Sequence, residues 1–298
     1  MGDLITIVIP TYNEREDMLR KAIETVLNQT YPDIELILVD DGCTDNTPEI
    51  LQEYAVRDSR VRVFRRERDS AFRSIAQAFN IGLENARGKW WHHDAADCWH
   101  ELDWAKRCMD FIRGRENEVL GVHTNWWVHH FDGTTEFVNT GERWRGDWST
   151  FQNYQLYDSF GGMLFRMDIA RKAGLWDPRF PRHQTREWTY RVLRQGDHVY
   201  LPRALWHFVF HEPDQMKRRA SVKYRILADL KNGIDPECDL RISLGSEDGR
   251  YAVLDACRAF FTDPVWEPER LSGVTKDRMD RLLAVCNEEA SESWHKQP

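Results

Sequence analysis

The sequence predicts an α/β fold in which a mostly parallel sheet is flanked by helices. Short runs of apolar and β-branched residues, such as Ile5–Ile9 and Ile34–Val39, are typical of strands buried on both faces. Amphipathic stretches alternate with these runs over the first third of the chain. Because consecutive strands joined by a helix need a right-handed crossover, we expect the strands to pair in parallel.

The predicted elements follow in regular order. Strands are expected at residues 5–9, 34–39 and 61–64 and from Trp90 onward. Helices are expected between them, over residues 18–27, 47–55 and 75–86, where apolar side chains recur at helical spacing. Later in the chain the pattern predicts a helix at 102–113, strands at 119–128, 199–202 and 205–210, and helices around 251–261 and 276–286.

Composition limits the functional classes. The 298 residues carry a formal net charge of −8, so the chain has no basic footprint for nucleic acid or an anionic membrane. The six cysteines include no Cys-x-x-Cys pair, which argues against a zinc ribbon and gives no disulfide framework. The apolar run Leu4–Pro10 is too short to span a bilayer. We therefore expect a soluble, cytoplasmic protein without an integral membrane segment.

Polar side chains follow three of the predicted strands. They are Thr11, Tyr12, Asn13 and Glu14 after the first strand, Asp40 and Asp41 after the second, and Asp94 and Asp97 after the fourth. In open α/β sheets, ligands bind at the carboxyl ends of the strands. Acidic oxygens there suit a hard divalent cation that carries phosphates. The alternative is an Asp-rich turn that only caps the next helix.

Two common nucleotide motifs are absent. No Gly-x-Gly-x-x-Gly follows the first strand, which disfavours a dehydrogenase-type dinucleotide fold. The chain also lacks the Gly-x-x-x-x-Gly-Lys-Ser/Thr sequence of a phosphate-binding P-loop. A ligand would instead contact the polar groups that follow the predicted strands.

Three motifs in register resemble glycosyltransferase family 2. They are Val8–Glu14 (VIPTYNE), Leu38–Asp45 (LVDDGCTD), and Asn80–Leu83 (NIGL) with Ala86–Gly88. The resemblance implies a GT-A, Rossmann-like fold and an inverting hexosyltransferase. Such an enzyme moves a sugar from a nucleoside diphosphate sugar, here UDP or dTDP, to an acceptor hydroxyl. The sequence does not identify the acceptor, which can be a glycan, a lipid-linked sugar, a small molecule or a protein.

On this basis we divide the chain into two parts. Residues 1–215 form the expected GT-A domain, with a nucleotide-binding half at 1–100 and an acceptor half at 101–215. Residues 216–298 form an expected C-terminal helical extension. The apolar stripes of its helices need a surface to pack on, so they can mediate a homo-oligomer.

The resemblance also implies donor-binding residues. In the family, the loop after the first strand and the second aspartate of Asp-Asp-Gly hold the base of the nucleotide. The corresponding positions here are Pro10, Thr11, Tyr12, Glu14 and Asp41. A carboxylate can accept the imide N–H of uracil in a charge-assisted hydrogen bond. For Asp40, a turn residue that satisfies backbone N–H groups is an equally good interpretation.

The metal motif departs from the family pattern. Where the family has Asp-x-Asp, the chain reads Asp94-Ala95-Ala96-Asp97, so one expected carboxylate is an alanine. The resemblance implies that Asp97 coordinates Mn²⁺ or Mg²⁺. Asp94 is assigned to donor binding, provided that the turn brings it round. His211 falls where many GT-A enzymes place an additional metal ligand, and His207 is its competitor.

His92 and His93 also suggest a metal site, but neighbouring strand residues face opposite ways. Packing or an indirect role is therefore the better interpretation of this pair.

The catalytic base is missing from its family position. The family has Glu-Asp at the start of a helix, whereas Gln184 and Thr185 stand here. The nearest candidates for a base are Glu187 and His183. For Glu187 the alternative is a first-turn carboxylate that the helix dipole favours.

The segment from Trp126 to Trp148 contains four tryptophans. It is a candidate acceptor or sugar surface, and core packing or a protein interface are the alternatives. Because two signature carboxylates are lost, the main rival function is a non-catalytic member that only binds a nucleotide sugar. A nucleotidyltransferase is the weakest interpretation, since its glycine-rich basic loop is absent.

Overall fold

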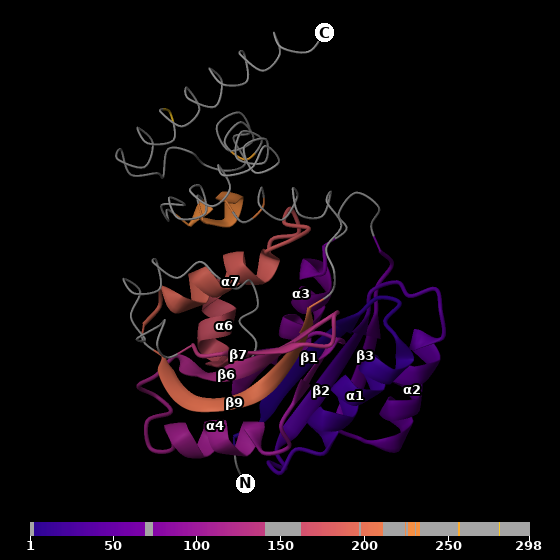
Figure 1. The fold of residues 1–298 in the computed structure, drawn as a ribbon, viewed down its shortest axis with the longest axis horizontal. Coiled ribbons are helices and arrows are strands. Elements are labelled where there is room, and N and C mark those ends of the chain that lie inside the picture. Colours follow the sequence, from indigo (N-terminus) through magenta and orange to yellow (C-terminus); the bar gives the residue numbers. More distant parts are fainter. Residues whose placement is uncertain are drawn as a thin grey trace. The chain divides into compact units, whose positions relative to one another are not determined.

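The protein is described by a computed structural model covering residues 3–68, 74–140, 162–196 and 198–210, with 224, 226–229, 231, 232, 256 and 280. Two compact units are present, Met1–Glu212 and Pro213–Pro298. The second unit is described only at scattered residues, among which Ile226, Leu227, Ala228 and Ala256 are buried. The helices predicted after residue 250 lie almost wholly outside the described residues. Most of the described residues belong to the first unit (Figure 1).

A parallel four-stranded sheet forms the first half, as predicted. Its strands are β1 (Ile5–Thr11), β2 (Ile34–Asp40), β3 (Val61–Arg65) and β4 (Trp90–His93). They lie in the order β3-β2-β1-β4, with β1 hydrogen-bonded to β2 and β4. Every residue of β1 and β2 is buried. This burial on both faces explains why these strands are mostly apolar and do not alternate regularly with polar residues.

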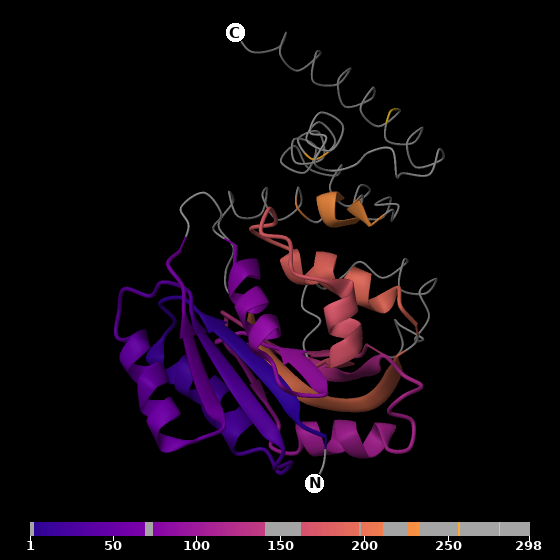
Figure 2. The ribbon, with the colours of Figure 1, turned by 180° about the vertical axis from the view of Figure 1, so that it is seen from behind.

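Helices cover both faces of this sheet (Figure 2). The odd-numbered residues of β1 share a core with α1 (Glu16–Leu27), α2 (Thr47–Arg57) and α4 (Trp104–Ile112). On the other face, α3 (Ala76–Asn85) packs against β1 and β2. Each helix buries the apolar stripe that its sequence predicted, for example Leu19, Ala22, Ile23 and Val26 of α1.

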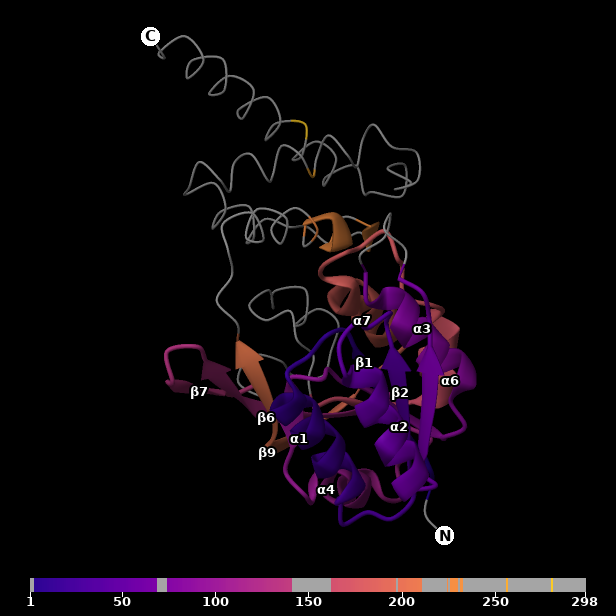
Figure 3. The same ribbon diagram turned by 90° about the vertical axis from the view of Figure 1, so that its right-hand side faces the viewer.

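Three antiparallel pairs and one parallel pair, the latter between residues 122–130 and 199–210, extend the sheet beyond β4. The order continues as β8-β6-β9-β5, where β8 is Leu164–Arg166, β6 is Gly121–His130, β9 is Val199–Phe210 and β5 is Cys98–His100. The strand β7 (Thr135–Val138) pairs with β6, and Figure 3 shows β6, β7 and β9 at one side of the sheet. Two helices, α6 (Met167–Ala173) and α7 (Gln184–Leu193), complete the unit. The α/β class with a mostly parallel sheet and flanking helices is confirmed.

The sequence predicted two strands around Pro202, but the structure has one. Strand β9 runs through the proline, and its register against β6 shifts at Asn125, which pairs with Ala204. A proline lacks the N–H that a ladder needs, so it lies in a sheet only at an edge or a bulge. The irregular register at Asn125 is such a bulge, and it lets one long strand continue past Pro202.

Strand β5 was not predicted, and it changes the interpretation of the aspartates. Asp94–Asp97 forms a turn that joins β4 to β5, and Cys98 pairs with Phe208 of β9. The next helix, α4, begins at Trp104, with Asp103 at its N-cap. The alternative that Asp94 and Asp97 cap the following helix is therefore wrong.

Gly82 of the NIGL motif allows α3 to approach β1 closely. A Cβ atom at this position would lie 2.4 Å from Val8 Cγ1 and 2.8 Å from Cγ2. Because both atoms belong to a fully buried side chain, the overlap can be relieved only by moving the helix.

We expect Gly82→Ala to lower the free energy of unfolding by about 1–3 kcal/mol through overpacking. Urea denaturation measures this change. The double variant G82A/V8A, which removes the clashing methyl groups, is the control, and we expect it to be less destabilised than the sum of its single variants. Additive losses would show that the two residues do not interact.

Candidate functional site

The ends of β1, β2 and β4 meet at one edge of the sheet. Thr11 is in register with Asp40, and the backbone N–H of Asp41 donates to Thr11 O at 2.9 Å. The N–H of Asp94 donates to Val8 O at 2.9 Å. Parallel pairing therefore brings the three polar segments predicted from sequence to the same edge.

Side-chain contacts tie the loops after β1 and β2 together. Asn13, which adopts a left-handed φ of 48°, accepts the N–H of Thr44 at 2.8 Å and donates to its hydroxyl at 3.0 Å. Asp40 accepts the N–H of Cys43 at 2.7 Å and pairs with Arg65 at 2.9 Å. Among the described residues Asp40 thus fills the turn role that was one of its two interpretations.

Two arginines that the sequence analysis missed surround Asp41. This aspartate is only 2% exposed, and Arg66 Nη1 donates to its Oδ1. Arg68 Nε lies 3.7 Å from Oδ2. Burial raises the pKa of Asp41, whereas the Arg66 hydrogen bond opposes that rise. The signal that could have found these residues is the basic run Arg65-Arg66-Glu67-Arg68 directly after β3.

The other predicted donor-binding residues differ in exposure. Pro10 and Thr11 are buried, and Thr11 Oγ1 has no hydrogen-bond partner among the described residues. Tyr12 is 45% exposed, and its ring lies under the guanidinium of Arg68, whose Cζ is 3.6 Å from the ring centroid. Glu14 is half-buried, and its Oε1 accepts the N–H of Arg15. Together, these groups form an aromatic and cationic edge beside Asp41.

Asp94 and Asp97 have different surroundings within their turn. The carboxyl group of Asp94 is fully buried: Trp206 Nε1 donates to Oδ1 at 3.0 Å, and Oδ2 lies 3.5 Å from His100 Nδ1. Burial is the largest cause that raises the pKa of Asp94 to about 7. Asp97 is half-buried, and the thiol of Cys98 lies 3.4 Å from its Oδ1. The carboxyl group of Asp94 therefore faces the interior, and its assignment to donor binding stays a prediction that this geometry does not favour.

His92 and His93 point to opposite sides of β4, as predicted. His92 contacts His100 and Trp104, whereas the ring of His93 packs edge-on against Phe79, Trp176 and Trp188. Burial lowers the pKa of His92 to about 4 and that of His93 to about 3. Both rings are therefore neutral near pH 7 and contribute to the core.

In the described part of the chain, one group of three side chains brings metal-ligating atoms within 4.8 Å of one another: His92, Asp94 and His100. This group does not contain Asp97, the predicted ligand. Asp97 supplies one carboxylate, which fits Mg²⁺ or Mn²⁺ only when a ligand and water provide the remaining oxygens. His211, the second predicted ligand, lies outside the described residues.

The competitor of His211 is already engaged. His207 Nε2 lies 3.0 Å from Glu101 Oε1, and its Nδ1 lies 3.0 Å from His129 Nε2. Its ring also stacks on Trp99, with an interplanar angle of 8°. Both nitrogens of His207 thus have side-chain partners, which leaves His207 poorly suited to a metal.

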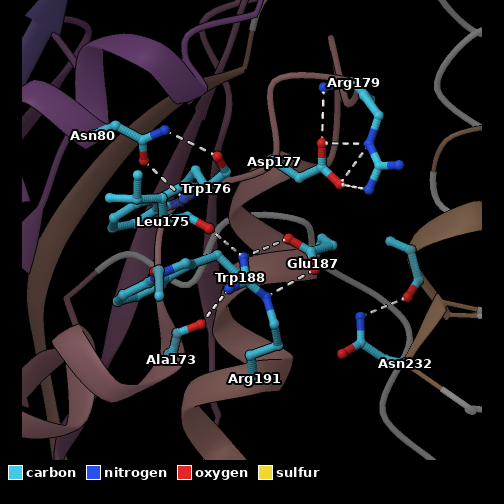
Figure 4. A network of polar contacts seen from close by, with 12 residues as sticks. Asn80, Ala173, Leu175, Trp176, Asp177, Arg179, Glu187, Trp188, Arg191 and Asn232 are labelled. Atoms are coloured by element: carbon cyan, nitrogen blue, oxygen red, sulfur yellow. Dashed lines mark hydrogen bonds and ion pairs between the residues drawn. The ribbon is translucent and has the colours of Figure 1, made fainter. Parts of the chain in front are cut away.

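Glu187 is buried in an ion pair (Figure 4). Arg191 donates from Nε to Oε1 at 2.9 Å and from Nη2 to Oε2 at 2.8 Å. Arg191 also donates to the backbone oxygens of Ala173 and Leu175. A carboxylate held at both oxygens by a guanidinium is a poor acceptor for a substrate proton. The geometry favours a structural role for Glu187, and its assignment as a base stays a prediction.

His183, the other candidate base, occupies the N-cap of α7 with a left-handed φ of 57°. It is 8% exposed, and its backbone oxygen accepts the N–H of Glu187 at 3.0 Å. A left-handed backbone at a residue other than glycine is uncommon and is often found at functional sites.

Asn80 holds the second half of the unit against the first (Figure 4). Its Oδ1 accepts the N–H of Trp176 at 2.7 Å, and its Nδ2 donates to Trp176 O at 3.0 Å. The ring of Trp176 stacks on Trp188 of α7 at 3.8 Å, and Trp188 Nε1 donates to Gly174 O. This contact places α7, with Glu187 and His183, relative to α3.

The tryptophan-rich segment is only partly described. Trp126 is buried on β6 and packs edge-on against Trp206, and Trp127 packs against Phe137 of β7. The two later tryptophans, at 144 and 148, lie outside the described residues. The core interpretation is correct for Trp126, and the acceptor surface stays a prediction for the remainder.

The structure adds one observation on membranes. In the portion of the chain that is described, no helix is long and apolar enough to cross a bilayer.

Comparisons with known proteins agree with this geometry. "Glycosyltransferase GlyG" of Streptococcus pneumoniae is 42% identical over 90 residues, which are 30% of this chain and 29% of that protein. An "Uncharacterized glycosyltransferase" of Haemophilus influenzae is 36% identical over 47% of this chain and 54% of its own length. The chain thus spans about half or less of these relatives. The crystal structure of S. aureus TarS 1-349 in complex with UDP-GlcNAc superposes with a TM-score of 0.64 at 14% identity, over 97% of this chain and 92% of that one, which shows a shared fold.

A family model also matches the chain directly. The model described as "Glycosyl transferase family 2" covers residues 6–176, more than half of the sequence. This range contains all three motifs and the edge where β1, β2 and β4 end. The chain belongs to glycosyl transferase family 2.

Proposed function

We propose that this protein transfers a sugar from a nucleoside diphosphate sugar, most favourably a UDP-sugar, to an acceptor hydroxyl with inversion and with the help of Mn²⁺ or Mg²⁺. The observation that carries the proposal is the convergence of Thr11, Asp41 and the Asp94–Asp97 turn at one sheet edge. Membership of family 2 and the fold shared with a UDP-GlcNAc complex support it.

The loops that follow β1, β2 and β3 suit a nucleotide. The carboxylate of Asp41 can accept the imide N–H of uracil, and the hydrogen bond from Arg66 opposes the rise in pKa that burial causes. The exposed face of Tyr12 is available for stacking, with Arg68 on the ring. The two arginines also place positive charge beside the site of a diphosphate, although the chain as a whole is acidic. A local cationic site therefore compensates for the net charge.

Asp97 would hold the divalent cation, together with oxygens of the diphosphate and water. The cation would neutralise negative charge on the departing diphosphate. The chain's own task at this position is to present one carboxylate at the end of β4, in a turn fixed by pairing with β5 and β9.

Proton removal from the acceptor needs a base, and the Glu187–Arg191 ion pair leaves His183 as the better candidate. Imidazole is the side chain that most readily exchanges protons near neutral pH. The aromatic stack of Trp176 and Trp188 would hold α7 and its N-cap in place during the transfer.

A binding protein without catalysis is the second candidate. Ala96 and Thr185 both favour it, because each stands where the family has a carboxylate, and the nearby Glu187 is held in an ion pair with Arg191. Incubation with UDP-sugars and Mn²⁺ separates the two functions. Release of UDP supports an enzyme, whereas UDP binding without any turnover would support the binding protein.

We expect Asp97→Asn to lower kcat by roughly 100-fold, because charge on the leaving diphosphate loses its stabilisation. The measurement is UDP release from a UDP-sugar at saturating Mn²⁺. Asp110→Asn is the matched control, since Asp110 is an exposed acid on α4 that pairs only with Lys106 and Arg113 among the described residues. Equal rates for the D97N variant and the parent would refute the metal assignment.

We expect Glu187→Gln to lower the free energy of unfolding by about 3 kcal/mol, because Arg191 loses the charge that compensates it in a buried pair. Urea denaturation measures this loss, and E187M/R191M, which removes both charges, should recover much of it.

We expect His183→Asn to lower kcat with little change in stability. The base would be Glu187 if E187Q lost turnover while its stability stayed at the parent level.

A further inference from the structure

A buried chain of polar groups runs beneath the turn that carries Asp97. Asp94 Oδ2 lies 3.5 Å from His100 Nδ1, His100 Nε2 lies 3.0 Å from His92 Nε2, and His92 Nδ1 lies 2.7 Å from the backbone oxygen of Met163. Each of the three side chains belongs to a residue that is at most 4% exposed. Their protons must therefore be arranged among themselves, because water does not reach them.

The backbone carbonyl of Met163 fixes the tautomers of His92 and His100. Met163 O can only accept, so His92 Nδ1 carries a hydrogen. Burial keeps His92 neutral, which leaves its Nε2 as an acceptor. His100 Nε2 must then donate to it. Since burial also holds the pKa of His100 well below its usual value, His100 is neutral and its Nδ1 presents a lone pair to Asp94.

An ionised Asp94 does not fit this arrangement. Its Oδ1 accepts a hydrogen bond from Trp206 Nε1, but Oδ2 has no hydrogen-bond partner among the described residues and faces the lone pair of His100 Nδ1. Two acceptors opposed in the interior repel each other, and each remains unsatisfied. A proton on Oδ2 turns this repulsion into an O–H···N hydrogen bond and satisfies both atoms.

Among the neighbouring titratable groups, Asp97 and the histidines act in the same direction, whereas a hydrogen bond from Cys98 lowers the pKa of Asp94. Asp97 and Cys98 lie on the adjoining turn and strand, His92 is on β4, and His207 is on β9. The negative charge of Asp97 opposes a second charge on Asp94 and raises its pKa. The histidines oppose a positive charge on His100. A neutral pair is therefore favoured over an ion pair of Asp94 and His100.

We infer that Asp94 is a protonated carboxylic acid whose Oδ2–H donates to His100 Nδ1, and that it acts as a positioning residue for the turn that presents Asp97. These buried polar groups connect the turn to three strands: to β5 through His100, to β4 through His92 and to β9 through Trp206. They also connect it to Met163, the residue before β8. Only the role given to Asp97 rests on the proposed function.

The same three side chains contain metal-ligating atoms, but the hydrogen bonds compete with a metal. Both nitrogens of His92 and Nε2 of His100 already have partners. The remaining atoms, His100 Nδ1 and Asp94 Oδ2, are two ligands, whereas zinc sites in proteins use at least three. A proton therefore satisfies the group more completely than an ion does.

Two variants test the inference. Asp94→Asn keeps the shape of the side chain, and its amide N–H can donate to His100 while its oxygen accepts from Trp206. Asp94→Ala removes both contacts and serves as the comparison. We expect D94A to have a clearly lower melting temperature than the parent and D94N to recover most of that loss. A carboxylate needed in its ionised form would instead make D94N as unstable as D94A.

Stability against pH supplies a second readout. Because the pKa of Asp94 in the folded protein is raised to about 7 from 3.8, the folded state binds the extra proton, and its contribution is full below pH 3.8. That contribution is lost as the pH rises towards about 7. We therefore expect the melting temperature of the parent to fall more steeply over this interval than that of D94N. Parallel curves would overturn the inference.

Spectroscopy reports the proton directly. Infrared spectra of the parent at mildly acidic pH, below the pKa of Asp94, should contain a carboxylic-acid carbonyl band that shifts in D₂O and is missing in D94N. Nitrogen NMR should place the hydrogen of His100 on Nε2. A bound metal ion, detected by elemental analysis of the purified protein and lost in a His100→Ala variant, would overturn the inference.

A final measurement connects the chain of groups to Asp97. Titration with UDP and Mn²⁺ should show weaker binding in D94A, and D94N should recover the binding that D94A loses. If D94A binds as the parent does, Asp94 does not position the turn. The infrared, NMR and stability readouts need no donor, so they stand or fall independently of the proposed glycosyltransferase activity.

Discussion

The pairing of β1 with β2 and β4 is the constraint on which the rest of the unit depends. It is parallel on both sides, so the carboxyl ends of all three strands point to one edge. The register then sets where each strand ends. Thr11 lies opposite Asp40, so β1 and β2 end together, whereas β4 ends opposite Val8, three residues before the end of β1. This offset leaves room above β4 for the Asp94–Asp97 turn.

Contacts between the two halves complete the site edge. Asn80 on α3 holds the backbone of Trp176 at two points, and the stacked rings of Trp176 and Trp188 carry that contact to α7. Gly82 lets α3 lie directly on Val8 of β1. The contacts from α3 to Trp176 and α7 therefore position these elements relative to β1. The motif that resembles the family thus has a structural reason at both Asn80 and Gly82.

The buried acids of this protein are stabilised in different ways. Asp41 and Glu187 lie beside arginines, which compensate their charge. Asp94 faces neutral imidazole and indole groups, where the proton is the more effective compensation. Charge near the turn is then concentrated on Asp97. This distribution gives a physical meaning to the altered metal motif, since one carboxylate acts there as a neutral structural group.

The sequence by itself determined the parallel first half, the family and the loops at the strand ends, because buried apolar runs and local turn motifs depend on short stretches of chain. It also indicated that His92 and His93 diverge, which follows from the period of a strand. Tertiary structure alone decided the short strand β5, the continuity of β9 through Pro202, the burial of Glu187, and the partners of Asp94 and Asp41. Those partners come from distant segments, such as Trp206 for Asp94, and the protonation and availability of a carboxyl group depend on what surrounds it in space.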